Sequence, residues 1–76
     1  MPLYYFDIHE NDEIVVDELG MDLPDLRAAA IEAAQSLSDM AKDLLPDDAR
    51  YSLAIEVRSN STPLFKAALA YEFSRH

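Results

Sequence analysis

The sequence predicts a single α+β domain with the element order ββαββ, in which four strands form one antiparallel sheet and one long helix packs on one face. Two observations support this fold class. Residues 3–17 and 51–73 each contain two runs of alternating apolar and polar residues, a pattern typical of half-buried strands. The segment between them repeats its apolar residues every three to four positions, as an amphipathic helix does. The 76 residues suffice for one domain, which we expect to span residues 1–76.

The first hairpin is predicted from residues 3–9 and 13–17. In the run LYYFDIH, Tyr4, Phe6 and Ile8 fall on one face, and the aromatic and β-branched content favours a strand. The following run EIVVD is shorter, and the residues between the two runs tolerate turn geometry.

The register of this hairpin depends on the length of its loop, because a one-residue slip turns a whole face over. A two-residue loop at Asn11 and Asp12 would place Asp17 opposite Phe6 on the core face. A three-residue loop would place Val16 opposite Phe6 instead. We predict the longer loop, with Asn11 or Asp12 in the left-handed conformation that such loops need.

The stretch DELGMDLPDLRAAA is predicted to contain the start of the helix. We expect Asp22 to be the N-cap, because Pro24 then lies in the first turn, where a missing N–H costs little. Asp25 would occupy the third helical position and reach back in a capping box. Met21 and Leu26 would form a hydrophobic staple across the cap. We therefore interpret this acidic junction as a helix start and not as an ion-binding site.

The helix is predicted to run from Leu23 to about Leu45 and to end at Pro46, which disfavours helical geometry in the preceding residue. One apolar stripe should face the sheet. Its predicted members are Leu26, Ala30, Ala33, Leu37, Met40, Ala41 and Leu44. Ile31 lies off this stripe and is expected on the surface.

The second hairpin is predicted from residues 51–58 and 63–73, joined by the turn SNST. In YSLAIEVR, the residues Leu53, Ile55 and Val57 should point inward. The alanines of PLFKAALAYEF also suit a helix, but we predict a strand because its large apolar residues share one parity. These residues are Phe65, Ala67, Leu69, Tyr71 and Phe73.

The opening MPLYYFDIH and the later stretch DELGMDLPDLRAAAIEA share a set of spaced residues with known sequences. The residues are Pro2, Tyr4, Phe6, Asp17, Gly20, Leu23 and Asp25. In this spacing the chain resembles a small bacterial family of domains of unknown function, whose members begin M-P-x-Y-x-F and continue D-x-x-G-x-x-L-x-D before an alanine-rich helix. Asn11 stands where members usually carry a turn glycine. The resemblance implies the ββαββ layout and implies no activity, cofactor or catalytic residue.

Charge and composition exclude several classes of partner. Fifteen acidic and six basic residues give a net charge of −9, which opposes binding modes that neutralise phosphates. We therefore expect no nucleic acid partner and no membrane partner. No apolar run approaches the about 18 residues of a membrane-spanning helix. The chain has no cysteine, in keeping with a cytoplasmic, soluble protein.

The sequence offers little for catalysis or metal binding. Its single glycine, Gly20, excludes a phosphate-cradling glycine loop, and no serine stands in a glycine-flanked elbow. In DIHENDE, the side chains of Asp7, His9 and Glu10 are of the types that bind zinc or manganese, but such sites need three or four converging ligands. We predict no enzyme, no catalytic residue, no cofactor and no metal, and keep a metal-binding hairpin, or a metal-dependent enzyme built on it, as the alternative.

Self-association is the expected source of additional stability, because a 76-residue chain without disulfides has a thin core. The sheet face that the helix leaves uncovered should be more apolar than a solvated face. The interface residues predicted on it are Tyr5, Val15, Ala54, Leu64, Ala68 and Ala70. We predict a homodimer formed over this face or along an edge strand, and a protein-interaction or regulatory module as the function.

Overall fold

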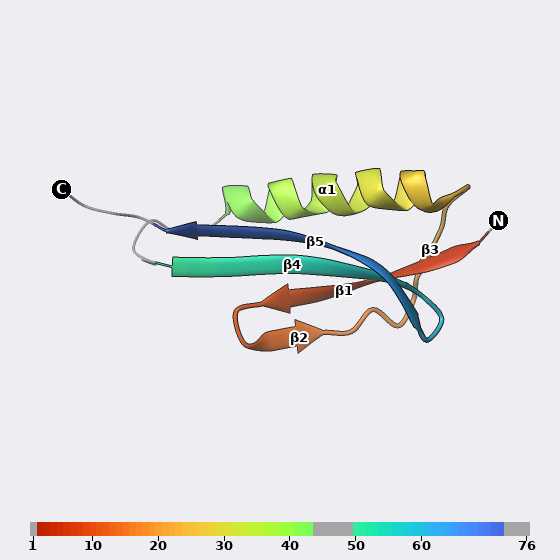
Figure 1. The fold of residues 1–76 in the computed structure, drawn as a ribbon, viewed down its shortest axis with the longest axis horizontal. Coiled ribbons are helices and arrows are strands. Elements are labelled where there is room, and N and C mark those ends of the chain that lie inside the picture. The colour runs from red at the N-terminus through yellow and green to blue at the C-terminus, as the bar shows by residue number, and fades with distance from the viewer. Residues whose placement is uncertain (1, 44–49, 73–76) are drawn as a thin grey trace.

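The computed structural model describes residues 2–43 and 50–72, which contain one helix and a five-stranded sheet (Figure 1). The elements in chain order are β1 (Leu3–Glu10), β2 (Glu13–Val15), β3 (Met21–Asp22), α1 (Leu26–Lys42), β4 (Arg50–Ser59) and β5 (Thr62–Glu72). The α+β class with one helix on an antiparallel sheet is confirmed. The structure adds β3, a two-residue strand between the first hairpin and the helix.

The main strand order is β2-β1-β4-β5, so β1 and β4 are central and β2 and β5 are the edges. β4 occupies one side of β1 along most of its length. The other side is shared: β2 pairs with the end of β1, and β3 pairs with its beginning, where Met21 is opposite Tyr4. Between β2 and β3, a stretch of β1 is left without a strand partner on that side.

The register predicted for the first hairpin is wrong, because the loop has two residues and not three. Val15 pairs with Ile8, and Asp17 lies beside Phe6 in place of Val16. The longer loop would have kept an aspartate off the core face. Asp17 instead accepts the backbone N–H of Phe6 with its carboxylate at 3.1 Å and so replaces the missing strand partner there.

Asn11 explains why the short loop is stable. It has a positive φ of 51°, as predicted for one of the two loop residues. Its backbone N–H donates to the carbonyl oxygen of Ser52 at 2.9 Å, and its Oδ1 accepts the Ser52 N–H at 3.1 Å. An asparagine at this position therefore extends the pairing of β1 with β4 by one residue.

The second hairpin agrees with the sequence prediction. Leu53, Ile55 and Val57 of β4 are buried, and the last segment is a strand and not a helix. Ser59 pairs with Thr62 across a two-residue loop. Of the residues predicted to point inward from the last strand, Phe65, Ala67 and Leu69 pack against the core, while the side chains of Tyr71 and Phe73 lie outside the described part.

The helix begins later than predicted. Asp25, and not Asp22, is the N-cap: its Oδ1 accepts the backbone N–H of Ala28 at 2.9 Å. Asp22 belongs to β3, and the next residue, Leu23, donates its N–H to the carbonyl oxygen of Pro2 at 3.1 Å. Pairing with the start of β1 therefore holds the chain extended through Leu23, and the predicted capping box cannot form.

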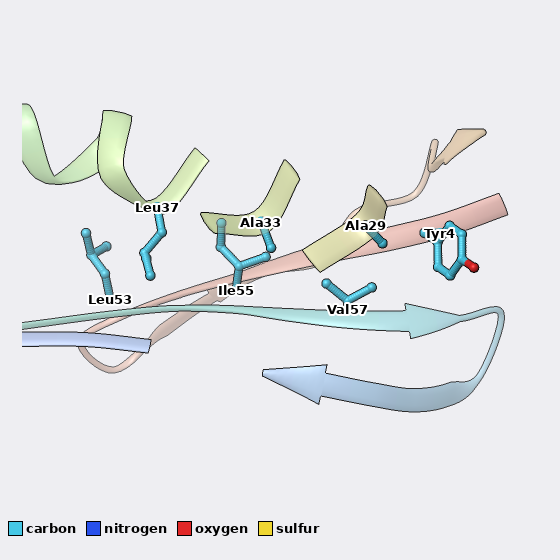
Figure 2. Close-up of a cluster of buried hydrophobic side chains, with 7 residues drawn as sticks. All are labelled: Tyr4, Ala29, Ala33, Leu37, Leu53, Ile55 and Val57. Atoms are coloured by element: carbon cyan, nitrogen blue, oxygen red, sulfur yellow. The ribbon is translucent and has the colours of Figure 1, made fainter. Parts of the chain in front are cut away.

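The core lies between α1 and the sheet, and its buried strand residues come from β1 and β4 (Figure 2). Ala29 and Ala33 are fully buried, and Leu37 lies one turn further along the same face. Because alanine side chains are small, the first half of α1 approaches the sheet closely, above Ile55 and Val57 of β4. The described part of the chain holds no helix that is both long and apolar enough to span a bilayer.

The predicted helix stripe is correct in its second half and rotated in its first. Ala33 and Leu37 are buried, and Ile31 is 50% exposed, as expected of a residue off the stripe. Ala30 and Leu26 are exposed, however, because Ala29 takes the inward position. The predicted stop at Pro46 and the stripe member Leu44 lie outside the described residues.

α1 covers only half of the face on which it packs. It contacts β4 and β5, and Figure 1 shows it running along these strands, with β2 at the opposite edge of the sheet. The same face of β1 and β2 therefore extends beyond the helix. Phe6 and Ile8, which belong to that face, are only half-buried.

Candidate interaction surface

The sheet face turned away from α1 is called the outer face here. Residues that pair directly across antiparallel strands share a face. His9, Ala54 and Ala68 pair in a row across β1, β4 and β5 and belong to the outer face. By the same alternation Tyr5 and Ala70 lie on it too. Leu64 lies at a register shift between β4 and β5 and is 39% exposed.

Val15 does not lie on the outer face, which corrects the face predicted for this residue. It pairs with Ile8, whose side chain belongs to the helix-side face, and Ile14 takes the outer position opposite His9. Ile14 is 60% exposed and Val15 59%, so the edge strand β2 presents an exposed apolar side chain on each face. Ala54 is on the outer face as predicted but is only 8% exposed, so it offers a partner little surface.

The middle of the outer face is polar. Asp7 is 7% exposed, and its Oδ2 accepts a hydrogen bond from Arg58 Nε at 2.8 Å. The guanidinium carbon of Arg58 lies 4.6 Å from the centroid of the Tyr5 ring, within cation–π range. Arg58 also donates to the carbonyl oxygen of Asn60. Tyr5, predicted as an interface residue, is thus half-buried and in contact with Arg58.

Asp17 joins this polar group to the loop after β2. Its Oδ1 accepts the backbone N–H groups of residues 19 and 20, at 3.0 and 3.1 Å, while Oδ2 accepts that of Phe6. Its own N–H donates to Asp7 Oδ1 at 2.9 Å, and its carbonyl oxygen accepts Arg58 Nη2 at 2.8 Å. These bonds tie the loop to β1 and β4.

Gly20 allows the loop to turn tightly against β1. Its φ is +75°, in the region that favours glycine. A Cβ atom at this position would lie 2.9 Å from Leu3 Cγ and 3.0 Å from Tyr5 Cε1, both closer than normal contacts. A side chain here would therefore strain the backbone and displace its neighbours.

The pKa shifts in this group follow from the same bonds. Burial raises the pKa of Asp7, but hydrogen bonds from Arg58 and from the Asp17 N–H outweigh it and hold the pKa below its ordinary value. Burial likewise raises the pKa of Asp17, and the backbone N–H groups it accepts lower it further than burial raises it. The hydrogen bond to Asp7 raises the pKa of Arg58. A general acid or base works best with a pKa near neutral, and both carboxyl groups are shifted away from that range.

The hairpin residues proposed as metal ligands do not converge. Asp7 and His9 lie on the outer face, whereas Glu10 has the opposite parity and accepts a hydrogen bond from the hydroxyl of Tyr51. The Asp7 carboxylate is bonded to Arg58 and to the Asp17 N–H. Among residues 2–43 and 50–72 there is no group of three or more histidine, cysteine, aspartate or glutamate side chains placed to hold a metal ion.

A further apolar surface lies on the helix-side face, beyond α1. We call it the open half and define it by Phe6, Ile8, Val15 and Leu19. These residues line a groove of about 360 Å³ together with Val16, Asp17 and Glu18. Leu19, at 88%, is more exposed than the other exposed large apolar residues described.

The open half is not among the surfaces predicted above, although the sequence contains a pattern that indicates it. In EIVVD, apolar residues occupy Ile14, Val15 and Val16 in succession, so both faces of the strand are apolar. That pattern is typical of a strand covered on both sides. On the edge strand of this chain it leaves apolar side chains exposed on both faces.

Comparison with models of protein families shows to which family the chain belongs. A family described as Domain of unknown function (DUF6894) matches residues 3–70. The chain belongs to this family. The predicted membership in a family of domains of unknown function is thereby confirmed. In this DUF6894 member, Asp17 and Gly20, which carry part of that resemblance, anchor the loop after β2.

Comparison with curated proteins and with solved structures gave no match. The DUF6894 description names no activity. The function of this member is therefore argued from its own surfaces.

Proposed function

We propose that this DUF6894 protein is a non-enzymatic interaction module that self-associates through its sheet as a homodimer. The observation that carries the proposal is the apolar character of β2 and the residue after it. Ile14, Val15 and Val16 are each more than half exposed, although they follow one another at the edge of the sheet. Scattered exposed apolar residues are normal, but a contiguous group of this kind is typical of an interaction site.

The shape of the chain supports the same proposal. Its radius of gyration is 13.7 Å, compared with about 11 Å for a compact chain of this length. It exposes 5547 Å², roughly 850 Å² more than a monomeric protein of its mass. A standard interface buries about 800 Å² per partner. The additional exposed area is thus similar to what one subunit of a stable dimer buries.

The polar group around Asp7 supports a non-enzymatic role. Asp7, Asp17 and Arg58 have shifted pKa values, which often indicate a functional site. Here each of them is bonded to its neighbours, and these bonds fasten a loop. The proposal keeps the bacterial, cytoplasmic setting and the absence of nucleic acid and membrane partners expected from the sequence, since a net charge of −9 repels polyanions.

Light scattering of the purified chain across a concentration series tests the proposal. We expect a mass of twice 8.6 kDa at high micromolar concentration. Two copies at −9 repel each other, so added salt should strengthen the dimer, because screening acts over about 8 to 10 Å. A mass of 8.6 kDa at every concentration and salt level would refute self-association.

A further inference from the structure

Self-association, if it is the function as proposed above, requires a surface, and the structure favours one that the sequence did not suggest. α1 packs on β4 and β5 and leaves the open half uncovered on the same side of the sheet. Phe6 and Ile8 belong to the open half and pack against the core, but they are only half-buried. The helix layer therefore stops halfway across an apolar face.

The sheet of a second copy would fit beside α1, because a packed sheet and a packed helix need layers of similar thickness. Stacked sheets lie about 10 Å apart, and a helix is about 10 Å in diameter. If the open halves of two chains face each other, each β1–β2 pair occupies the layer beside the partner's α1. The two helices then flank a small sheet-on-sheet contact, and the helix-side layer is complete in both chains.

The open half is also self-complementary. Leu19 lies at the rim of the groove and is 88% exposed, and Phe6, Ile8 and Val15 line the rest of its apolar wall. In a two-fold contact the same patch meets itself, so a projection on one chain meets the hollow on the other. Leu19 of each copy can thus enter the groove of its partner.

The charges around the groove oppose a contact between two copies only weakly. Among the described residues that line it, Asp17 and Glu18 are acidic and none is lysine or arginine. Both oxygens of Asp17 accept backbone N–H groups, which hold its carboxylate against the loop, and Glu18 is the exposed acid at the margin. Repulsion between two such margins is screened by salt and does not oppose the apolar centre directly.

We propose that a second copy of the chain covers the open half, helix-side face against helix-side face about a two-fold axis, with Leu19 of each copy in the groove of the other. The outer face, with its Asp7–Arg58 ion pair, then remains turned to solvent. The surface used for association is therefore the one next to α1 and not the one behind the sheet.

The neighbours Ile14 and Val15 provide a matched test. They are equally exposed, belong to the same strand and lie on opposite faces. Val15→Lys and Leu19→Lys should raise the dissociation constant of the dimer at least about tenfold, since a charge would enter the centre of the contact. Ile14→Lys should leave it within about threefold. All three changes reduce the net charge, so weaker association cannot come from added repulsion.

The outcomes separate this inference from the proposed function. A wild-type chain that stays monomeric at high micromolar concentration refutes both. A dimer that Ile14→Lys dissociates, alone or together with the other two variants, places the contact on the outer face or the β2 edge and overturns the open-half interface while self-association stands. A dimer that survives all three changes lies elsewhere and overturns it equally. Circular dichroism checks that each variant folds; if Val15→Lys does not, the highly exposed Leu19→Lys decides.

Discussion

The side chain of Asp17 accepts a backbone hydrogen bond from the part of β1 that pairs with neither β2 nor β3. Its carboxylate accepts the N–H of Phe6, where neither β2 nor β3 reaches, and also the N–H groups of the turn at residues 19 and 20. Unsatisfied backbone donors in part-buried positions are costly. The carboxylate of Asp17 therefore takes the place of the backbone carbonyl oxygen that a neighbouring strand would supply.

Replacing Asp17 by Asn should lower the free energy of unfolding by about 1 to 3 kcal/mol. An amide offers one oxygen where the carboxylate offers two, so one of the N–H groups it now accepts would face another donor. Urea denaturation at low micromolar concentration measures the change. Glu18→Gln, the same loss of charge at an exposed neighbour, should stay within about 0.5 kcal/mol. Equal effects in the two variants would contradict the role given to Asp17.

The lowered pKa values of Asp7 and Asp17 predict how stability depends on pH. Because both carboxyl groups are more acidic in the folded chain than the ordinary value of 3.8, their charged forms stabilise the fold above that pH. The contribution is lost as the pH falls from about 4 through the folded-state pKa values. Melting temperatures across this range should therefore fall steeply for the native chain and less steeply for Asp7→Asn. Asp39→Asn, a change at an exposed position, is the control and should keep the pH dependence of the native chain. If Asp7→Asn also keeps it, the Asp7–Arg58 pair does not contribute to stability.

At the scale of elements, the competition between β3 and α1 decides where the helix starts. Asp22 and Asp25 are both suitable N-cap residues, and a proline lies between them. Local preference alone does not distinguish the two. Pairing of Met21 with Tyr4 and of the Leu23 N–H with Pro2 keeps the chain extended, which moves the cap to Asp25.

Asp25→Ala should therefore destabilise the chain by about 0.5 to 2 kcal/mol, the usual cost of losing an N-cap side chain. Asp22→Ala removes the same group from an exposed position of β3 and should change stability by less than about 0.5 kcal/mol. Thermal unfolding followed by circular dichroism compares them. The reverse order would restore Asp22 as the cap.

The packing of α1 gives a second test at this scale. Leu37 is 8% exposed against β4 and Ile31 is 50% exposed. Leu37→Ala should cost about 2 to 5 kcal/mol, enough to unfold much of so small a domain. Ile31→Ala removes an apolar group of the same size from a half-exposed site and should cost much less. If denaturation shows Ile31 to be the more sensitive position, the helix is rotated from the orientation described.

The elements predicted correctly from the sequence are those in which the spacing of apolar residues alone indicates which side chains are buried. Leu53, Ile55 and Val57 alternate with polar residues and are buried, and Leu37 repeats the helix period. The errors arise where a distant partner decides. Asn11 shortens the first loop through Ser52, forty-one residues away, and this one-residue change moved Val15 from the outer face to the open half. The family resemblance implied the order of the elements but gave no information about the outer face or the open half.

At the scale of the whole molecule, the fold consists of a long sheet with a helix over only half of one face. The principal extents are 50 × 21 × 17 Å, so most residues lie near a surface. A second chain can complete the helix-side layer without any change in the fold of the first. Oligomerisation would then supply the stability that small domains without disulfides usually obtain in this way.

The contact between the two open halves can be observed directly by isotope-filtered nuclear Overhauser spectroscopy on a mixture of labelled and unlabelled native chains. If the open halves form the contact, cross-peaks should join the methyl groups of Leu19 in one chain and the aromatic ring of Phe6 in the other, under conditions in which light scattering shows a dimer. Their absence, or cross-peaks joining Ile14 or Ala68 of the two chains in their place, would contradict this contact.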